Sequence, residues 1–214
     1  MIVKVCGVRT AEIVEVAVGA GADWIGLVFE PRSPRFAADV AAREVRRAVA
    51  GRASLIGVFV EPTVAECEAA AERYGLAAVQ VHGDVQPELA EASAVPVIRG
   101  INPRSAHEAF TDPWWPDCLV LLDALPDVDG LPGGTGRRVS AGVAEALARH
   151  RRIILAGGLT PDTVAAAIDE VRPEGVDASS GLESSPGVKD ASRVRDYVLR
   201  ARAAFDGRGD ADGG

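Results

Sequence analysis

The sequence alternates short apolar runs with stretches in which apolar residues recur at helical spacing. The runs are mostly apolar along their whole length instead of only at every second residue, which predicts strands buried on both faces, as in a parallel sheet covered by helices. Eight such units within 214 residues predict an α/β fold, a single closed (β/α)8 TIM barrel near its minimum size. The expected strands span 3–6, 24–29, 55–60, 77–81, 95–98, 118–122, 153–156 and 175–178. The expected helices span 10–20, 38–50, 63–74, 86–93, 105–110, 140–150, 161–171 and 191–204.

The composition favours one acidic globular domain. A hydrophobic content of 48% is enough for a sizeable core. We place the barrel domain in residues 1–205. Residues 206–214 are rich in Gly and Asp and are expected to form a disordered tail. A net charge of −8 and a pI near 5.0 argue against a nucleic-acid or membrane-surface partner. No apolar stretch reaches the roughly 20 residues of a membrane span, and no signal-type segment opens the chain, so we expect a cytoplasmic protein.

Cysteine and lysine are both scarce. The cysteines stand at 6, 67 and 118, an odd number that gives neither a disulfide framework nor a zinc-type pair spacing. We therefore predict no metal site. Lysine occurs only at 4 and 189, whereas arginine occurs 21 times. We interpret this bias as genomic base composition or adaptation to salt, with little bearing on mechanism.

Two residues with acid–base chemistry each close an apolar run. Cys6 ends the first run and is followed by Gly7, whereas Asp123 ends the sixth and precedes a long connection, 124–139, with four glycines and two prolines. In a parallel barrel the strand ends converge on one rim, where function usually resides. A thiolate base needs a pKa below its usual value of about 8.5, and a partly desolvated carboxyl can hold a proton to donate. The alternatives are a small core cysteine and a turn-capping carboxylate.

Glycines follow the last two expected strands. Gly157 and Gly158 come after the seventh strand, and Ser180 and Gly181 come after the eighth. Backbone N–H groups that a ligand can approach closely, near helix N-termini, are typical of the phosphate site of such barrels. We expect Asp177, just before the serines, to orient that loop. The alternative is that these glycines only form tight turns.

Two further positions line the expected mouth. The loop after the second strand holds Arg32 and Arg35 between prolines, and a rigidly held guanidinium suits bidentate capture of a carboxylate. A solvated surface charge is the default alternative. His82 ends the fourth strand, and we interpret it as a residue that lines the site.

Several short segments follow one another along the chain: Lys4-Val5-Cys6-Gly7, Gly26-Leu27-Val28-Phe29 with Pro31-x-Ser33-x-Arg35, Val79-Gln80-Val81-His82-Gly83-Asp84, Leu121-Leu122-Asp123, Gly133-Gly134-Thr135-Gly136, Ala156-Gly157-Gly158-Leu159 and Val176-Asp177-x-Ser179-Ser180-Gly181-x-Glu183. Together they resemble the phosphoribosylanthranilate isomerase family, in order, from residue 3 to about 190. The resemblance implies an Amadori rearrangement of a small-molecule phosphoribosyl substrate in tryptophan biosynthesis, no cofactor, and a monomer or homodimer. It implies Cys6 as general base, Asp123 as general acid, and Arg35 as the arginine that reads the anthranilate carboxylate. The segment 137–140 departs from the family pattern, because Arg-Arg-Val-Ser stands where the family has Lys-x-Phe-(Asp/Asn)-Trp.

Two rival interpretations stay open at this point. The histidine-pathway isomerase performs the same chemistry on a related ribosyl compound, but it resembles a repeated half-barrel with aspartates ending strands one and five, and here strand one ends in Cys6. A phosphosugar-binding protein without catalysis is the other, and the altered segment 137–140 is the feature that favours it.

Overall fold

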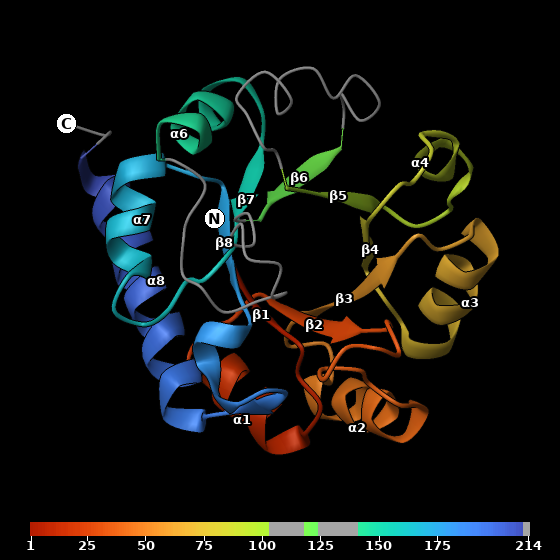
Figure 1. Cartoon of the computed structure of the whole chain (residues 1–214). Coiled ribbons are helices and arrows are strands. Elements are labelled where there is room, and N and C mark those ends of the chain that lie inside the picture. Colours follow the sequence, from red (N-terminus) through yellow and green to blue (C-terminus); the bar gives the residue numbers. More distant parts are fainter. Residues whose placement is uncertain (103–117, 124–140, 212–214) are drawn as a thin grey trace.

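The computed structural model describes residues 1–102, 118–123 and 141–211, with the side chains of 141, 142 and 209–211 left aside. Eight parallel strands form a closed barrel in sequence order, since β8 pairs with β1. The helices lie outside this ring of strands (Figure 1). The predicted (β/α)8 barrel is therefore confirmed. The strands are β1 (Ile2–Cys6), β2 (Trp24–Val28), β3 (Ser54–Val60), β4 (Ala78–His82), β5 (Val97–Ile101), β6 (Leu119–Leu122), β7 (Ile153–Leu155) and β8 (Gly175–Ala178).

The helices follow their strands along the chain. A short antiparallel pair, β9 (Glu183–Ser185) and β10 (Val188–Lys189), stands between β8 and the last helix. None of the helices in the described ranges is both long and apolar enough to cross a membrane. The helices are α1 (Ala11–Gly19), α2 (Asp39–Val49), α3 (Val64–Tyr74), α4 (Glu88–Ala92), α6 (Ala141–His150), α7 (Val164–Val171) and α8 (Ala191–Ala211), with a 3₁₀ turn, η1 (Ser180–Leu182).

Strand periodicity separates two sets of apolar side chains. One face of each strand packs outward against the helices and forms the main core, while the other face fills the barrel interior. The buried side chains of the interior layer are aliphatic, so polar side chains that point inward do so above or beside it. Its buried members are Ile56, Ala78, Ile98, Leu121, Ile154 and Ala156.

Most element ends lie within two residues of their predicted positions, and three ends lie further away. The fifth strand was predicted at 95–98 but runs to Ile101, because its backbone pairs with β6 through Arg99 and Gly100. The seventh helix was predicted from 161 but begins at Val164, because Thr160 and Thr163 bond to each other in a preceding turn.

The last helix extends into the expected tail. It was predicted to end at 204, yet it continues to Ala211, so residues 206–211 are helical. Phe205 is 2% exposed, and the guanidinium of Arg208 lies 6.0 Å from its ring centroid, one helical turn further on. That packing explains the continuation. Residues 212–214, the helix expected at 105–110 and the connection 124–139 lie outside the described residues.

Candidate active site

Cys6 lies on the inner face of the barrel at the carboxyl end of β1. Its side chain packs with Val28 and Val58, and Cys6 is only 7% exposed. The neighbouring strand makes room for it, because a Cβ on Gly26 would lie 2.8 Å from the Cys6 sulfur. Gly7 then turns the chain with a φ of +72°. The thiol is thus held at the rim, as its strand-end position predicted.

Charged side chains surround this thiol. Burial raises the pKa of Cys6, and the Asp177 carboxylate adds to that increase, whereas the ammonium groups of Lys4 and Lys189 oppose it. Lys4 stands two residues before Cys6 on the same face of β1, and its positive charge favours the thiolate. The pKa of Cys6 therefore reflects a balance between a dry environment and two nearby positive charges.

Asp123 follows β6 directly and is half-buried. Its N–H donates to the Ile101 carbonyl oxygen at 3.0 Å, which continues the pairing of β5 with β6 by one residue. Asp123 stands two residues after Leu121, which belongs to the interior layer, so alternation places Asp123 on the inner face as well. The structure brings Asp123 and Cys6 to the inner face of the same rim.

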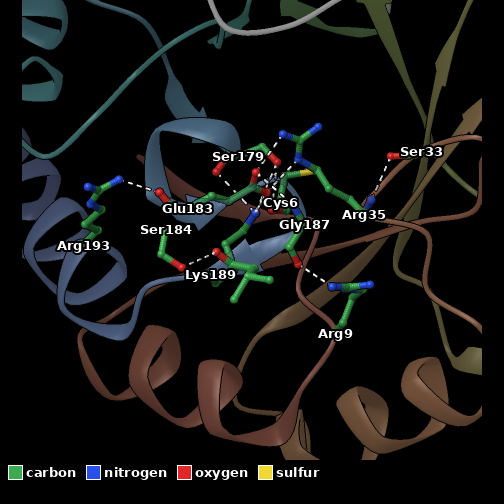
Figure 2. A network of polar contacts seen from close by, with 11 residues as sticks. Cys6, Arg9, Ser33, Arg35, Ser179, Glu183, Ser184, Gly187, Lys189 and Arg193 are labelled. Carbon is green, nitrogen blue, oxygen red and sulfur yellow. Dashed lines mark hydrogen bonds and ion pairs between the residues drawn. The ribbon is translucent and has the colours of Figure 1, made fainter.

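Arg35 is held by a bidentate ion pair. Its Nε and Nη2 donate to Glu183 Oε1 and Oε2 at 2.7 and 2.8 Å (Figure 2). Its aliphatic stem crosses Gly7, where a Cβ would lie 3.0 Å from Arg35 Cδ. Arg32, on the same loop, has a side chain that is 84% exposed and pairs with Glu30. The loop thus presents one partly buried and one solvated guanidinium.

Glu183 also accepts from a lysine. Lys189 Nζ lies 2.7 Å from Glu183 Oε1, and the Gly187 N–H donates to Oε2 at 3.2 Å. Burial would raise the pKa of Glu183, but Arg35 and Lys189 together hold it below its ordinary value. The carboxylate is therefore charged and fixes both cations beside the rim.

His82 lies at the end of β4 and packs over Gly100, where a Cβ would lie only 2.3 Å from the ring. Its Nε2 is 2.7 Å from Gln80 Nε2, so this ring nitrogen acts as the acceptor when the Gln80 amide donates. Burial, with the positive charges of Lys4 and Arg99, lowers the pKa of His82 to about 4. The imidazole is neutral at physiological pH and lines the barrel mouth.

The two glycine segments lie against each other. Gly157 and Gly158 have φ values of +84° and +67°, conformations that favour glycine. Gly181 packs on the preceding loop, because a Cβ there would lie 2.1 Å from the Leu159 carbonyl oxygen. Ser180 opens the 3₁₀ turn η1 beside it. Tight turning requires glycine at 157 and 158, and close approach requires it at 181, where the loops after β7 and β8 meet.

Asp177 differs from its predicted arrangement. We expected it to orient the serine loop, but its Oδ2 accepts from Lys4 Nζ at 2.7 Å inside the barrel, where both residues are buried. The two are cross-strand partners of β1 and β8. Oδ1 of Asp177 is buried without a hydrogen bond from the described residues.

Sequence reasoning missed the charged residues that support the site. It assigned no role to Lys4, Glu183 or Lys189, and it attributed the scarcity of lysine to composition. One signal was available for Lys4, which stands two residues before Cys6 on one strand and so faces the same interior. Within the described ranges, no three or more His, Cys, Asp or Glu residues are grouped to hold a metal ion.

Comparisons with known proteins agree on one family. A family model described as N-(5'-phosphoribosyl)anthranilate (PRA) isomerase matches residues 3–200. The N-(5'-phosphoribosyl)anthranilate isomerase of Roseiflexus sp. (strain RS-1) is 45% identical over 213 residues, which covers 94% of this chain and 98% of the relative. The crystal structure of phosphoribosyl anthranilate isomerase from Thermotoga maritima matches with a TM-score of 0.86 and 31% identity, over 95% of this chain and all of that one. Another crystal structure of such an isomerase, in complex with reduced 1-(o-carboxyphenylamino)-1-deoxyribulose 5-phosphate, gives a TM-score of 0.83 and 30% identity over 95% of this chain and 100% of that chain.

Proposed function

This chain belongs to the N-(5'-phosphoribosyl)anthranilate isomerase family of tryptophan biosynthesis, and we propose that Cys6 and Asp123 carry out its Amadori rearrangement. The reaction converts N-(5-phosphoribosyl)anthranilate to 1-(2-carboxyphenylamino)-1-deoxyribulose 5-phosphate. The observation that carries the proposal is the placement of a thiol and a carboxyl on the inner face of one barrel rim, at the ends of β1 and β6. Both groups exchange protons, and an aldose-to-ketose rearrangement needs one proton donated and one removed.

The proton transfers follow from the two side chains. Asp123 in its acid form protonates the furanose ring oxygen, so that the ring opens to a Schiff base at C1. Cys6 in its thiolate form removes the proton from C2, which gives an enolamine. Tautomerisation of this enolamine then forms the C2 ketone of the product.

Recognition of the two anionic ends follows from the order of strands around the rim. The glycine segments after β7 and β8, the thiol on β1 and the Arg35 loop after β2 are consecutive in the closed barrel. That order matches a substrate with a phosphate at one end, a ribose in the middle and an anthranilate at the other. Gly157, Gly158, Ser180 and Gly181 offer backbone N–H groups to the phosphate.

Arg35 binds the anthranilate end of the substrate. Arg35 Nε and Nη2 are engaged by Glu183, so its Nη1 edge is the part that faces the anthranilate carboxylate. His82 lines the mouth as a neutral imidazole. Asp177 acts below the substrate, where it holds Lys4 and presents Oδ1 as an acceptor.

An assay with two substrates tests the proposal. The purified protein is incubated with N-(5-phosphoribosyl)anthranilate and, separately, with the ribosyl substrate of the histidine-pathway isomerase, and each ketose product is quantified. We expect turnover of the first substrate and not of the second, and strongly reduced turnover of the first by Cys6→Ala. Turnover of only the second would assign the chain to the histidine-pathway reaction. Binding of either without turnover would support a phosphosugar-binding protein.

A further inference from the structure

The chain contains only two lysines among its 23 basic Lys and Arg residues, and both lie beside Cys6. The Lys4 side chain is fully buried, and that of Lys189 is 3% exposed. Lysine and arginine are mostly surface residues and are almost never fully buried unless paired. Two buried lysines at one thiol, in a chain that otherwise uses arginine, are a local arrangement that composition does not explain.

Lys4 approaches the thiol from within the barrel. It stands on the same strand and the same face as Cys6, two residues earlier, and its Nζ donates to Asp177 Oδ2 at 2.7 Å. Burial alone would lower the pKa of Lys4, but Asp177 and Cys6 raise it above the ordinary lysine value. Its ammonium form is therefore retained in the interior.

Lys189 approaches from β10, on the other side of the site. Its Nζ donates to the Ser179 carbonyl oxygen at 3.3 Å and to Glu183 Oε1 at 2.7 Å. Ser179 Oγ in turn donates to the Cys6 carbonyl oxygen at 3.2 Å. Figure 2 shows Lys189, Ser179 and Cys6 gathered in one polar network, with Glu183 and Arg35 beside them. Burial lowers the pKa of Lys189, and Glu183 opposes this decrease.

We propose that Lys4 and Lys189 are positioning residues that together favour the thiolate form of Cys6, an inference that rests on the proposed role of Cys6 as the general base. Each lysine is held by its own carboxylate, Asp177 for Lys4 and Glu183 for Lys189. The carboxylates keep the lysines protonated and in place, and the ammonium groups stabilise negative charge on sulfur.

The choice of lysine has a geometric reason. An ammonium is a compact charge with three donors on a flexible stem, whereas a guanidinium is a planar fork. Lys4 fits within the closed barrel, and Lys189 shares Glu183 Oε1 with Arg35, which takes the carboxylate bidentately. The charged groups that face Cys6 are thus Lys4 on β1, Asp177 on β8 and Lys189 on β10. Glu183 pairs with Lys189 and also with Arg35.

The test measures the ionisation of Cys6 directly, in the full chain without substrate. The rate of alkylation by iodoacetamide is followed from pH 6 to 11.5 by mass spectrometry of the peptide that contains Cys6. The midpoint of that profile reports the thiol pKa and does not depend on how accessible the thiol is. Cys67, whose pKa burial raises to about 11, is the internal reference in the same sample.

We expect Lys189→Met to move the Cys6 midpoint upward by about one unit, which is a roughly tenfold lower alkylation rate at pH 7. Lys4→Met should have an equal or larger effect where it folds. Lys189→Arg retains the charge and should stay within about threefold of the parent protein. Arg9→Met is the matched control. Arg9 donates to the Gly187 carbonyl oxygen, in the turn between β9 and β10, and Figure 2 shows Gly187 between Arg9 and Cys6.

An unchanged Cys6 midpoint in Lys189→Met would overturn the proposal, as would an equal shift in Arg9→Met. A purely structural role would lower stability without moving the midpoint or the rise of kcat/KM with pH. The proposed function fails in a different way. If Cys6→Ala kept normal turnover while Lys189→Met still shifted the midpoint, Cys6 would not be the base and the lysine effect would stand.

Discussion

Cys6 and Asp123 divide the two proton transfers, so each should be needed for turnover and neither for folding. Removing a general acid or base typically costs on the order of 10²–10⁴-fold in rate. We therefore expect Cys6→Ala and Asp123→Asn to lower kcat by that factor, with the thermal midpoint of unfolding little changed. Cys67→Ala is the matched control, because Cys67 lies on α3, outside the barrel interior. Near-normal turnover in either rim variant would contradict the assignment.

Arg35 and Arg32 differ in burial, which makes them a natural pair of variants. A charge-assisted hydrogen bond contributes about 1.5–3 kcal/mol, so its loss should weaken binding of a carboxylated product analogue by roughly 10- to 100-fold. Arg35→Ala should also lose most of its preference for the carboxylated over the decarboxylated analogue. Arg32→Ala should keep that preference, since the Arg32 side chain is 84% exposed and bound to Glu30.

Calorimetric titration of both analogues into both variants checks this prediction. Lys189 still pairs with Glu183 in Arg35→Ala, so the carboxylate is not left without a cation. An equal loss of preference in the two variants would show that a different residue reads the carboxylate.

At the scale of elements, the loops after β7 and β8 carry the proposed phosphate site. Gly158→Ala should raise KM for the phosphorylated substrate several-fold and weaken inhibition by inorganic phosphate, because a methyl group would stand where the anion approaches the backbone. The residue has a φ of +67°, so the variant also introduces strain. Gly51→Ala is matched in strain, with a φ of +76° and open space around the added carbon, and it precedes β3 at the other end of the barrel.

Steady-state kinetics and thermal unfolding on both glycine variants separate strain from binding. Similar losses of stability with a raised KM only in Gly158→Ala would support the site. A raised KM in both variants would attribute the effect to strain.

The strands were predictable from sequence where their apolar runs were unbroken, as in β6 and β7. The end of β5 was not, because Arg99 and Gly100 interrupt the run. Gly100 is small because His82 on β4 packs over it, a requirement that only the paired strands reveal. The start of α7 was misplaced for a similar reason, since Thr160 and Thr163 bond to each other before the helix begins. Local signals locate an element, and its neighbours set its ends.

At the scale of the whole molecule, closure of the barrel creates ion pairs that could not be predicted from the sequence. The rim positions of Cys6 and Asp123 were predictable because a strand end is a local feature. The Lys4–Asp177 pair joins residues 173 positions apart, and the Arg35–Glu183 pair joins residues 148 positions apart. Both depend on the pairing of β8 with β1, which places the last quarter of the chain against the first.

His82 should affect the stability of the whole molecule in acid. Its pKa is lowered to about 4 in the folded protein, chiefly by burial, against an ordinary value of 6.5. Between these values the unfolded chain binds a proton that the folded chain does not, so the free energy of unfolding falls as the pH decreases from about 6.5 to about 4. The loss from this one group is on the order of 2–3 kcal/mol.

Urea unfolding at pH 6.5 and 4.5 measures that loss, and His82→Gln should reduce it by about 2 kcal/mol relative to the parent protein. The comparison removes the contribution of the carboxyl groups, which titrate in both proteins. His150→Gln is the control, because His150 is exposed on α6 and its replacement should leave the loss unchanged. Equal losses in His82→Gln and the parent protein would mean that the His82 imidazole gains its proton in the folded barrel near its ordinary pKa. The neutral ring inferred for the barrel mouth would then be wrong.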